Sequence, residues 1–170
     1  TLKKWVWGKR SFNSLSATMT TTTEEPLPLV ASRSVVAHDK QVNVGAVSPN
    51  DTLVATGSQD RTVKLWNAVD LSLRVALVGH KRGVWDCRFS PVNRAVATAT
   101  ADQTIKLWST QDGDCARTFQ GHTGSVLWVS FLRDGAQLVS SGAQLASSGG
   151  DGLFKEWMVR TKVCETTMDD

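Results

Sequence analysis

The sequence predicts an all-β fold built from repeated four-stranded units, and the first observation behind this prediction is an internal repeat. His38, His80 and His122 follow one another at intervals of 42 residues, and Asp60 and Asp102 are also 42 residues apart. A period of about 40–45 residues, with His early and Trp late, is typical of one four-stranded blade of a β-propeller. We therefore expect about three blades, arranged in an open arc.

The second and third observations are strand-like alternation and regularly spaced turns. Val63 and Leu65, like their counterparts Ile105 and Leu107, alternate with polar residues at a period of two. Pro-Asn-Asp and Asp-Gly sequences stand between these segments and favour turns. No segment shows sustained helical periodicity, so the repeats are expected to contain strands only.

The repeat positions divide the chain into six parts. Three blades cannot close a ring, because propellers have about four to eight blades, so we expect the sequence to be part of a longer protein or a truncated product. The polar composition of the second part predicts a mobile loop. The parts are 1–7, the tail of a preceding blade; 8–27, a polar flexible insert; 28–72, 73–114 and 115–160, the three repeats; and 161–170, the start of a next repeat.

The third repeat is longer because it contains a tandem duplication. Residues 135–141 are followed directly by 142–148, which differ at one position. A shift of seven residues turns every side chain of a strand to the other face, so one copy must loop out. Ser140 and Ser147 are alternatives for the same position. We favour Ser147, because the tight turn to Asp151 fixes its spacing.

Glu156 is a second departure in the third repeat. It stands where Leu65 and Leu107 stand in the other repeats, at a position expected to be buried. We therefore expect the third blade to be the least stable of the three.

Each repeat carries His, a hydroxyl residue, Asp and Trp at similar offsets. These groups resemble those of a hydrolase, but a catalytic site is normally built once, and this set occurs three times. A structural role is therefore favoured, and no catalytic residue is expected. A metal site formed by the three His is disfavoured because each belongs to a different blade. The sets are His38, Thr56, Asp60 and Trp66; His80, Thr98, Asp102 and Trp108; and His122, Ser147, Asp151 and Trp157.

Composition excludes several classes of protein. The net charge is +3 with 21% charged residues, less than expected of a protein that binds nucleic acid by neutralising phosphates. Three Cys without a close pair predict neither a disulfide framework nor a zinc ribbon, and favour an intracellular protein. Cys115 and Cys164 share a repeat position with Leu73, which favours an apolar packing role. No apolar run is long enough to span a membrane, and no cofactor is expected.

Several longer segments of the sequence resemble those of a known family. The most specific are Ala55–Trp66, Gly79–Trp85 and Ala101–Trp108. They resemble the WD-repeat family, and within it the tandem-propeller subunits of the nucleolar small-subunit processome. The resemblance implies that each set forms a buried network in which Asp accepts from His, and the hydroxyl contacts both His and Trp. It also implies a nucleolar, nuclear scaffold for pre-ribosomal RNA processing that binds other WD-repeat subunits, with RNA contact indirect or weak and with no small-molecule substrate.

Propellers of this family usually bind partners through the loops after each His and around each Asp. The polar residues expected there, which we call the partner face, are Lys40, Gln59, Arg61, Lys81, Arg82 and Gln103. Their basic members could meet an acidic protein or an RNA phosphate; the alternative is that they are ordinary solvated charges. Two other functions remain open: a general WD-repeat adaptor, such as a ubiquitin-ligase substrate receptor, and, less favoured, a hydrolase.

Overall fold

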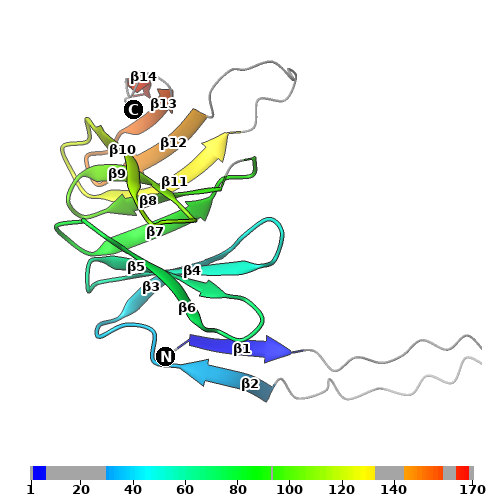
Figure 1. Cartoon of the computed structure of the whole chain (residues 1–170). Coiled ribbons are helices and arrows are strands. Elements are labelled where there is room, and N and C mark those ends of the chain that lie inside the picture. Colours follow the sequence, from blue (N-terminus) through cyan, green and yellow to red (C-terminus); the bar gives the residue numbers. More distant parts are fainter. Residues whose placement is uncertain (1, 7–29, 93, 133–143, 159–163, 169–170) are drawn as a thin grey trace, which may run out of the picture.

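The computed structural model describes residues 2–6, 30–92, 94–132, 144–158 and 164–168, and these form antiparallel strands joined by turns (Figure 1). The expected all-β propeller arc is confirmed. The polar insert 8–27 and the first heptad copy, 135–141, lie outside the described residues. Within the described part, the chain contains no helix of the length and apolarity needed to cross a membrane.

In each sheet, neighbouring strands follow one another in sequence. A two-stranded sheet pairs β1 (Leu2–Val6) with β2 (Val30–Val35). The first blade is β3 (Val42–Val47), β4 (Leu53–Ser58), β5 (Thr62–Asn67) and β6 (Leu73–Val78). The second is β7 (Val84–Phe89), β8 (Ala95–Thr100), β9 (Thr104–Ser109) and β10 (Cys115–Gln120). The third is β11 (Val126–Leu132), β12 (Gln144–Gly149), β13 (Phe154–Met158) and β14 (Cys164–Met168).

The core lies between neighbouring blades, because the alternating apolar residues of one blade pack against the next. Val63 and Leu65 of β5 share a buried cluster with Val84, Val96 and Trp108 of the second blade. Burial of large apolar side chains contributes about 1.5–3 kcal/mol each, so stacking the blades stabilises them.

The same packing recurs one blade further along the arc. Ile105 and Leu107 of β9 share a second buried cluster with Val126, Leu145 and Trp157 of the third blade. Each blade therefore depends on its neighbour to bury its apolar face.

The innermost strands β3, β7 and β11 are joined by two polar contacts. Asn43 donates through Nδ2 to the carbonyl oxygen of Val84 at 2.8 Å. The Oδ2 of Asp86 accepts the Val129 amide at 3.2 Å. Burial raises the pKa of Asp86, and hydrogen bonds from the Val129 amide and the charge of Arg88 only partly offset this. These contacts fix successive blades at the centre of the arc.

The loops fall on two edges of the arc. The β2–β3, β4–β5, β6–β7, β8–β9, β10–β11 and β12–β13 loops lie on one edge, at the left of Figure 1, and we call it the histidine edge. The β3–β4, β5–β6, β7–β8 and β9–β10 loops lie on the opposite edge. Residues at equivalent repeat positions near the strand ends therefore lie on the same edge of the arc.

Two expectations from single repeat positions have different outcomes. Glu156, at a position expected to be buried, is half-buried, whereas its repeat counterparts Leu65 and Leu107 are buried. The expected apolar packing role of Cys115 is wrong, because its side chain is exposed. The reason is its place on the outermost strand, where Leu73 of the first blade is also 51% exposed. The side chain of Cys164 lies outside the described part.

Candidate functional site

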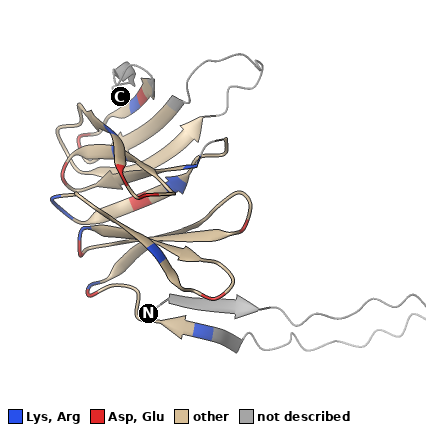
Figure 2. Ribbon diagram, in the orientation of Figure 1, with Lys and Arg blue, Asp and Glu red and all other residues tan. Residues whose placement is uncertain are grey.

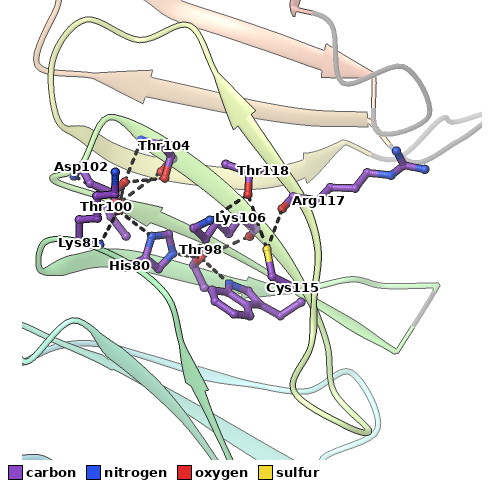
Figure 3. Close-up of polar contacts among 11 residues, drawn as sticks. His80, Lys81, Thr98, Thr100, Asp102, Thr104, Lys106, Cys115, Arg117 and Thr118 are labelled. Atoms are coloured by element: carbon purple, nitrogen blue, oxygen red, sulfur yellow. Dashed lines mark hydrogen bonds and ion pairs between the residues drawn. The ribbon is translucent and has the colours of Figure 1, made fainter.

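The second blade shows the repeated set in full (Figure 3). His80 follows β6 on the histidine edge, Asp102 stands in the β8–β9 turn, Thr98 lies in β8, and Trp108 lies in β9. His80 Nδ1 lies 3.0 Å from Asp102 Oδ2, and His80 Nε2 lies 2.7 Å from Thr98 Oγ1. Trp108 Nε1 donates to the same Thr98 oxygen at 2.9 Å. The four side chains thus form one chain of hydrogen bonds across the blade.

The first blade has the same arrangement. His38 Nδ1 lies 2.8 Å from Asp60 Oδ2, and His38 Nε2 lies 2.8 Å from Thr56 Oγ1. Trp66 Nε1 donates to Thr56 Oγ1 at 2.9 Å. The four repeat positions are therefore in contact here too.

The third blade uses a serine in place of the threonine. His122 Nδ1 lies 2.9 Å from Asp151 Oδ2, and His122 Nε2 lies 2.8 Å from Ser147 Oγ. Trp157 Nε1 donates to Ser147 Oγ at 2.8 Å. The structure brings Ser147 into the hydroxyl position, while Ser140 lies outside the described residues.

The direction of the hydrogen bonds follows from the charge on the carboxylate. The pKa of Asp102 lies below its ordinary value, so Asp102 is an ionised acceptor at neutral pH, and His80 Nδ1 must carry the proton between them. In the neutral imidazole, Nε2 is then an acceptor, and the Thr98 hydroxyl donates a hydrogen bond to it. The Thr98 oxygen in turn accepts from Trp108, so every member has a partner.

The low pKa of Asp102 has identifiable causes. Burial alone would raise this pKa. Hydrogen bonds from His80, from the hydroxyls of Thr100 and Thr104 and from the Lys81 amide lower it by more than burial raises it. The Lys81 amide lies 2.9 Å from Asp102 Oδ2. Hydrogen bonds to the charged form favour it, so the carboxylate remains ionised in a largely enclosed position.

Sequence reasoning missed the two hydroxyls that flank this aspartate. Thr100 and Thr104 both donate to Asp102 Oδ1, and Thr62 donates to Asp60 Oδ1 in the first blade. The signal was present as a hydroxyl residue two positions before and after Asp, in Ser58-Gln59-Asp60-Arg61-Thr62 and Thr100-Ala101-Asp102-Gln103-Thr104. Side chains at this spacing commonly bond across a turn.

The arrangement is poorly suited to nucleophilic catalysis. Thr56, Thr98 and Ser147 are all 0% exposed, so no substrate atom meets their hydroxyls in this structure. Each of these oxygens also accepts a Trp N–H, which draws electron density away from a nucleophile. Across the residues that the structure describes, no three His, Cys, Asp or Glu side chains gather in a way that could hold a metal ion.

The sets instead tie together the loops of the histidine edge. Asp102 Oδ2 accepts from the amide of Lys81, and Asp151 Oδ2 accepts from the amide of Thr123 at 2.9 Å. Asp102 and Asp151 therefore link their own turns to the loops that precede the innermost strands of their blades. A backbone amide bonded to a carboxylate holds a loop more firmly than a neutral pair does.

The structure places the partner face on these fixed loops. Two of its residues occupy the left-handed region, Arg61 with φ 75° and Gln103 with φ 68°, where the third repeat has Gly152 with φ 78°. A non-glycine residue in this region carries strain. Basic and acidic residues both occur along this edge (Figure 2). All six partner-face residues are exposed: Lys40, Gln59, Arg61, Lys81, Arg82 and Gln103.

A family model described as WD domain, G-beta repeat matches residues 30–67, 71–109 and 113–157. The chain belongs to the WD-repeat family. The matched segments cover most of the chain, and each begins before one of the three histidines and ends at or just after the tryptophan of the same set.

Individual WD-repeat proteins are similar to parts of this chain. Transducin beta-like protein 3 of Mus musculus is 48% identical over 76 residues, which is 45% of this chain and 10% of the mouse protein. U3 small nucleolar RNA-associated protein 13 of Saccharomyces cerevisiae is 37% identical over 86 residues, 51% of this chain and 9% of the yeast protein. Nuclear distribution protein PAC1-2 of Uncinocarpus reesii is 36% identical over 146 residues, 84% of this chain and 32% of that protein. The chain thus spans about a tenth of the length of the first two relatives.

Proposed function

We propose that this chain is a non-catalytic interaction scaffold of the small-subunit processome, where it serves pre-ribosomal RNA processing in the nucleolus. The observation that carries the proposal is the 48% identity to transducin beta-like protein 3, together with the similarity to a protein associated with U3 small nucleolar RNA. Its partners in this role are other WD-repeat subunits of the pre-ribosomal complex, and its RNA contact is indirect or weak.

The geometry of the repeated sets supports a role in binding rather than in catalysis. His80, Thr98 and Asp102 are used to hold one blade, and the Thr98 hydroxyl is closed to solvent. We propose that all three sets, including the set of Ser147, are structural. A set that fixes loops from within leaves the exposed side chains of those loops free to contact a partner.

We propose the partner face as the contact surface. Its four basic side chains, Lys40, Arg61, Lys81 and Arg82, are exposed on the histidine edge, where Asp102 holds the loop of Lys81 through its backbone amide. Preorganised loops lose less conformational entropy on binding, and basic side chains at the rim of an interface speed association with an acidic surface.

Affinity purification from eukaryotic cells tests this function. The tagged protein that carries this sequence is purified, and U3 small nucleolar RNA and partner proteins are measured. We expect U3 enrichment and co-sedimentation with pre-ribosomal particles, both weakened when Lys81→Glu and Arg82→Glu are combined. Arg33→Glu combined with Arg117→Glu changes the charge equally away from the partner face, and is expected to leave both unchanged.

A second candidate is a general WD-repeat adaptor. It is favoured by the broad similarity to nuclear distribution protein PAC1-2, which spans 84% of this chain. Purification with a ubiquitin-ligase or other scaffold, without U3 RNA, would favour the adaptor and contradict the processome role. Equal U3 recovery from the Lys81 and Arg82 variant would exclude the partner face but leave the processome role standing.

A further inference from the structure

A groove lies between the first and second blades on the edge opposite the histidines. The β3–β4 loop of one blade and the β7–β8 loop of the next form its walls, and residues of β6 and the β9–β10 loop complete it. Its volume is about 380 Å³, enough for a few side chains of a bound segment. It is separate from the partner face, which lies on the histidine edge.

The groove is positively charged. Arg74 of β6 and Arg94 at the end of the β7–β8 loop line it and are exposed, and none of its described lining residues is Asp or Glu. Neither arginine forms an ion pair with a carboxylate in the part of the chain that the structure describes. A concave surface lined by charges of one sign concentrates ligands of the opposite sign.

The groove also has an apolar wall. Pro49 and Pro91 line it from the two loops, with Phe89 half-buried below and Val92 76% exposed. The prolines carry no amide hydrogen, so this wall offers contact area rather than hydrogen bonds. A ligand that fits both the wall and the arginines must combine an anionic group with an apolar one.

The loops that form the groove are held rigid by their own hydroxyls. Ser48 Oγ donates to Asn50 Oδ1 at 2.8 Å and accepts from the Leu53 amide at 2.9 Å. Thr110 Oγ1 donates to the Arg94 carbonyl oxygen at 3.1 Å. Asn50 accepts the Ser48 hydrogen bond through its oxygen, so its amide NH₂ is a further donor among the lining residues of the groove.

Neither arginine belongs to the repeat. One repeat later, Ala116 stands at the position of Arg74, and Ala136 or Ala143 stands at that of Arg94, depending on which heptad copy is aligned. The blade fold therefore does not require arginine at either place. This contrasts with the His, Asp and Trp of the repeated sets, which recur in every blade.

We propose that this groove binds an extended acidic peptide segment of another protein. A Glu or Asp carboxylate of the segment accepts hydrogen bonds from Arg74 and Arg94, since guanidinium groups pair with carboxylates in bidentate fashion. A neighbouring apolar side chain of the segment lies against Pro91 and Val92. Single-stranded RNA is less well matched, because its bases need exposed aromatic faces, and Phe89 is the only aromatic residue of the described lining.

A peptide array followed by a titration tests the proposal. The labelled 170-residue chain is applied to nonapeptides with a central Glu and varied flanking residues, beside counterparts with Gln. The strongest peptide is then titrated by fluorescence anisotropy. We expect Glu peptides with an adjacent apolar residue to be selected, and the affinity to fall about tenfold or more when Arg74→Gln and Arg94→Gln are combined.

Matched controls separate this groove from other basic surfaces. Lys81→Gln combined with Arg82→Gln removes the same charge from the histidine edge and should leave peptide affinity within about twofold, whether or not the partner face serves the processome. Unchanged urea midpoints show that both variants are folded. Equal selection of Glu and Gln peptides, equal binding by the Arg74 and Arg94 variant, or tighter binding of a U-rich RNA oligonucleotide at the same arginines would each overturn the proposal.

Discussion

The second and third blades share the same four-residue set but support its aspartate differently. Asp102 accepts two threonine hydroxyls in addition to His80 and the Lys81 amide. At the equivalent positions of the third blade, Gly149 and Leu153 stand in place of those threonines.

Asp151 consequently has fewer donors. Burial would raise its pKa, and the Thr123 and Leu153 amides and His122 lower it to about 2, whereas the pKa of Asp102 is lowered further. Gly149 leaves no room for a side chain, since a Cβ there would lie 2.6 Å from Asp151 Oδ1 and 2.7 Å from His122 Nδ1. The third blade forms the repeated set without these two threonines, so the set does not require them. In the second blade their hydroxyls give Asp102 additional hydrogen-bond donors, which should limit the loss of stability when another donor is removed.

Removal of the histidines is expected to have the largest effect on stability, and the effect should be larger in the third blade than in the second. His122→Ala leaves Asp151 with backbone amides alone, and should lower the free energy of unfolding by about 4 kcal/mol. His80→Ala leaves Asp102 with its threonines and the Lys81 amide, and should cost about 3 kcal/mol. Urea unfolding at pH 7 measures both; a larger loss for His80→Ala would contradict the comparison.

Acid should act on the two carboxylates at different pH. Because both folded pKa values lie below the ordinary value, each carboxylate stabilises the fold above about pH 4. Its contribution is lost as the pH falls through the folded pKa, which is about 2 for Asp151 and lower for Asp102. Carboxyl carbon chemical shifts followed by NMR should therefore show Asp151 titrating first, and the reverse order would be inconsistent with the hydroxyl contacts of Asp102.

Glu156→Leu should have the smallest effect on stability, and it should stabilise the fold rather than destabilise it. Leu65 and Leu107 are buried at this repeat position, while Glu156 is half-buried. Half the burial of a leucine side chain contributes about 1 kcal/mol. We expect the urea midpoint to rise by a corresponding amount, and Glu156→Gln serves as the control that removes the charge alone. A lower midpoint for Glu156→Leu would show that this position is not an apolar one.

The repeat was enough to predict the fold class, because the period of 42 residues and the alternation of Val63 and Leu65 are local properties of the chain. It also pointed to the four positions that the structure brings into contact in each blade. The contacts themselves were implied by the resemblance to the WD-repeat family, because the separation of His and Asp is 22 residues in the first two repeats but 29 in the third.

Other features depend on packing between segments and were not visible in the repeat. Asp86 bonds to the next blade through Val129, a contact 43 positions away in sequence. The groove joins Arg74 and Arg94 from two blades, and neither has a repeat counterpart that would have drawn attention to it. The exposure of Cys115 follows from its outermost strand, which repeat counting did not identify.

We infer that the hydroxyls of Thr100 and Thr104 account for the stronger support of Asp102 in the second blade. Native-state hydrogen exchange of the β9 and β13 amides tests this, in the unaltered chain and in a Thr100→Ala, Thr104→Val variant. The two strands are comparable because each has a neighbouring strand on both sides. We expect the variant to lower the opening free energy of β9 by about 2 kcal/mol, toward that of β13, and to leave β13 unchanged. An unchanged opening free energy in β9, or an equal decrease in β9 and β13, would contradict this role of the two threonines.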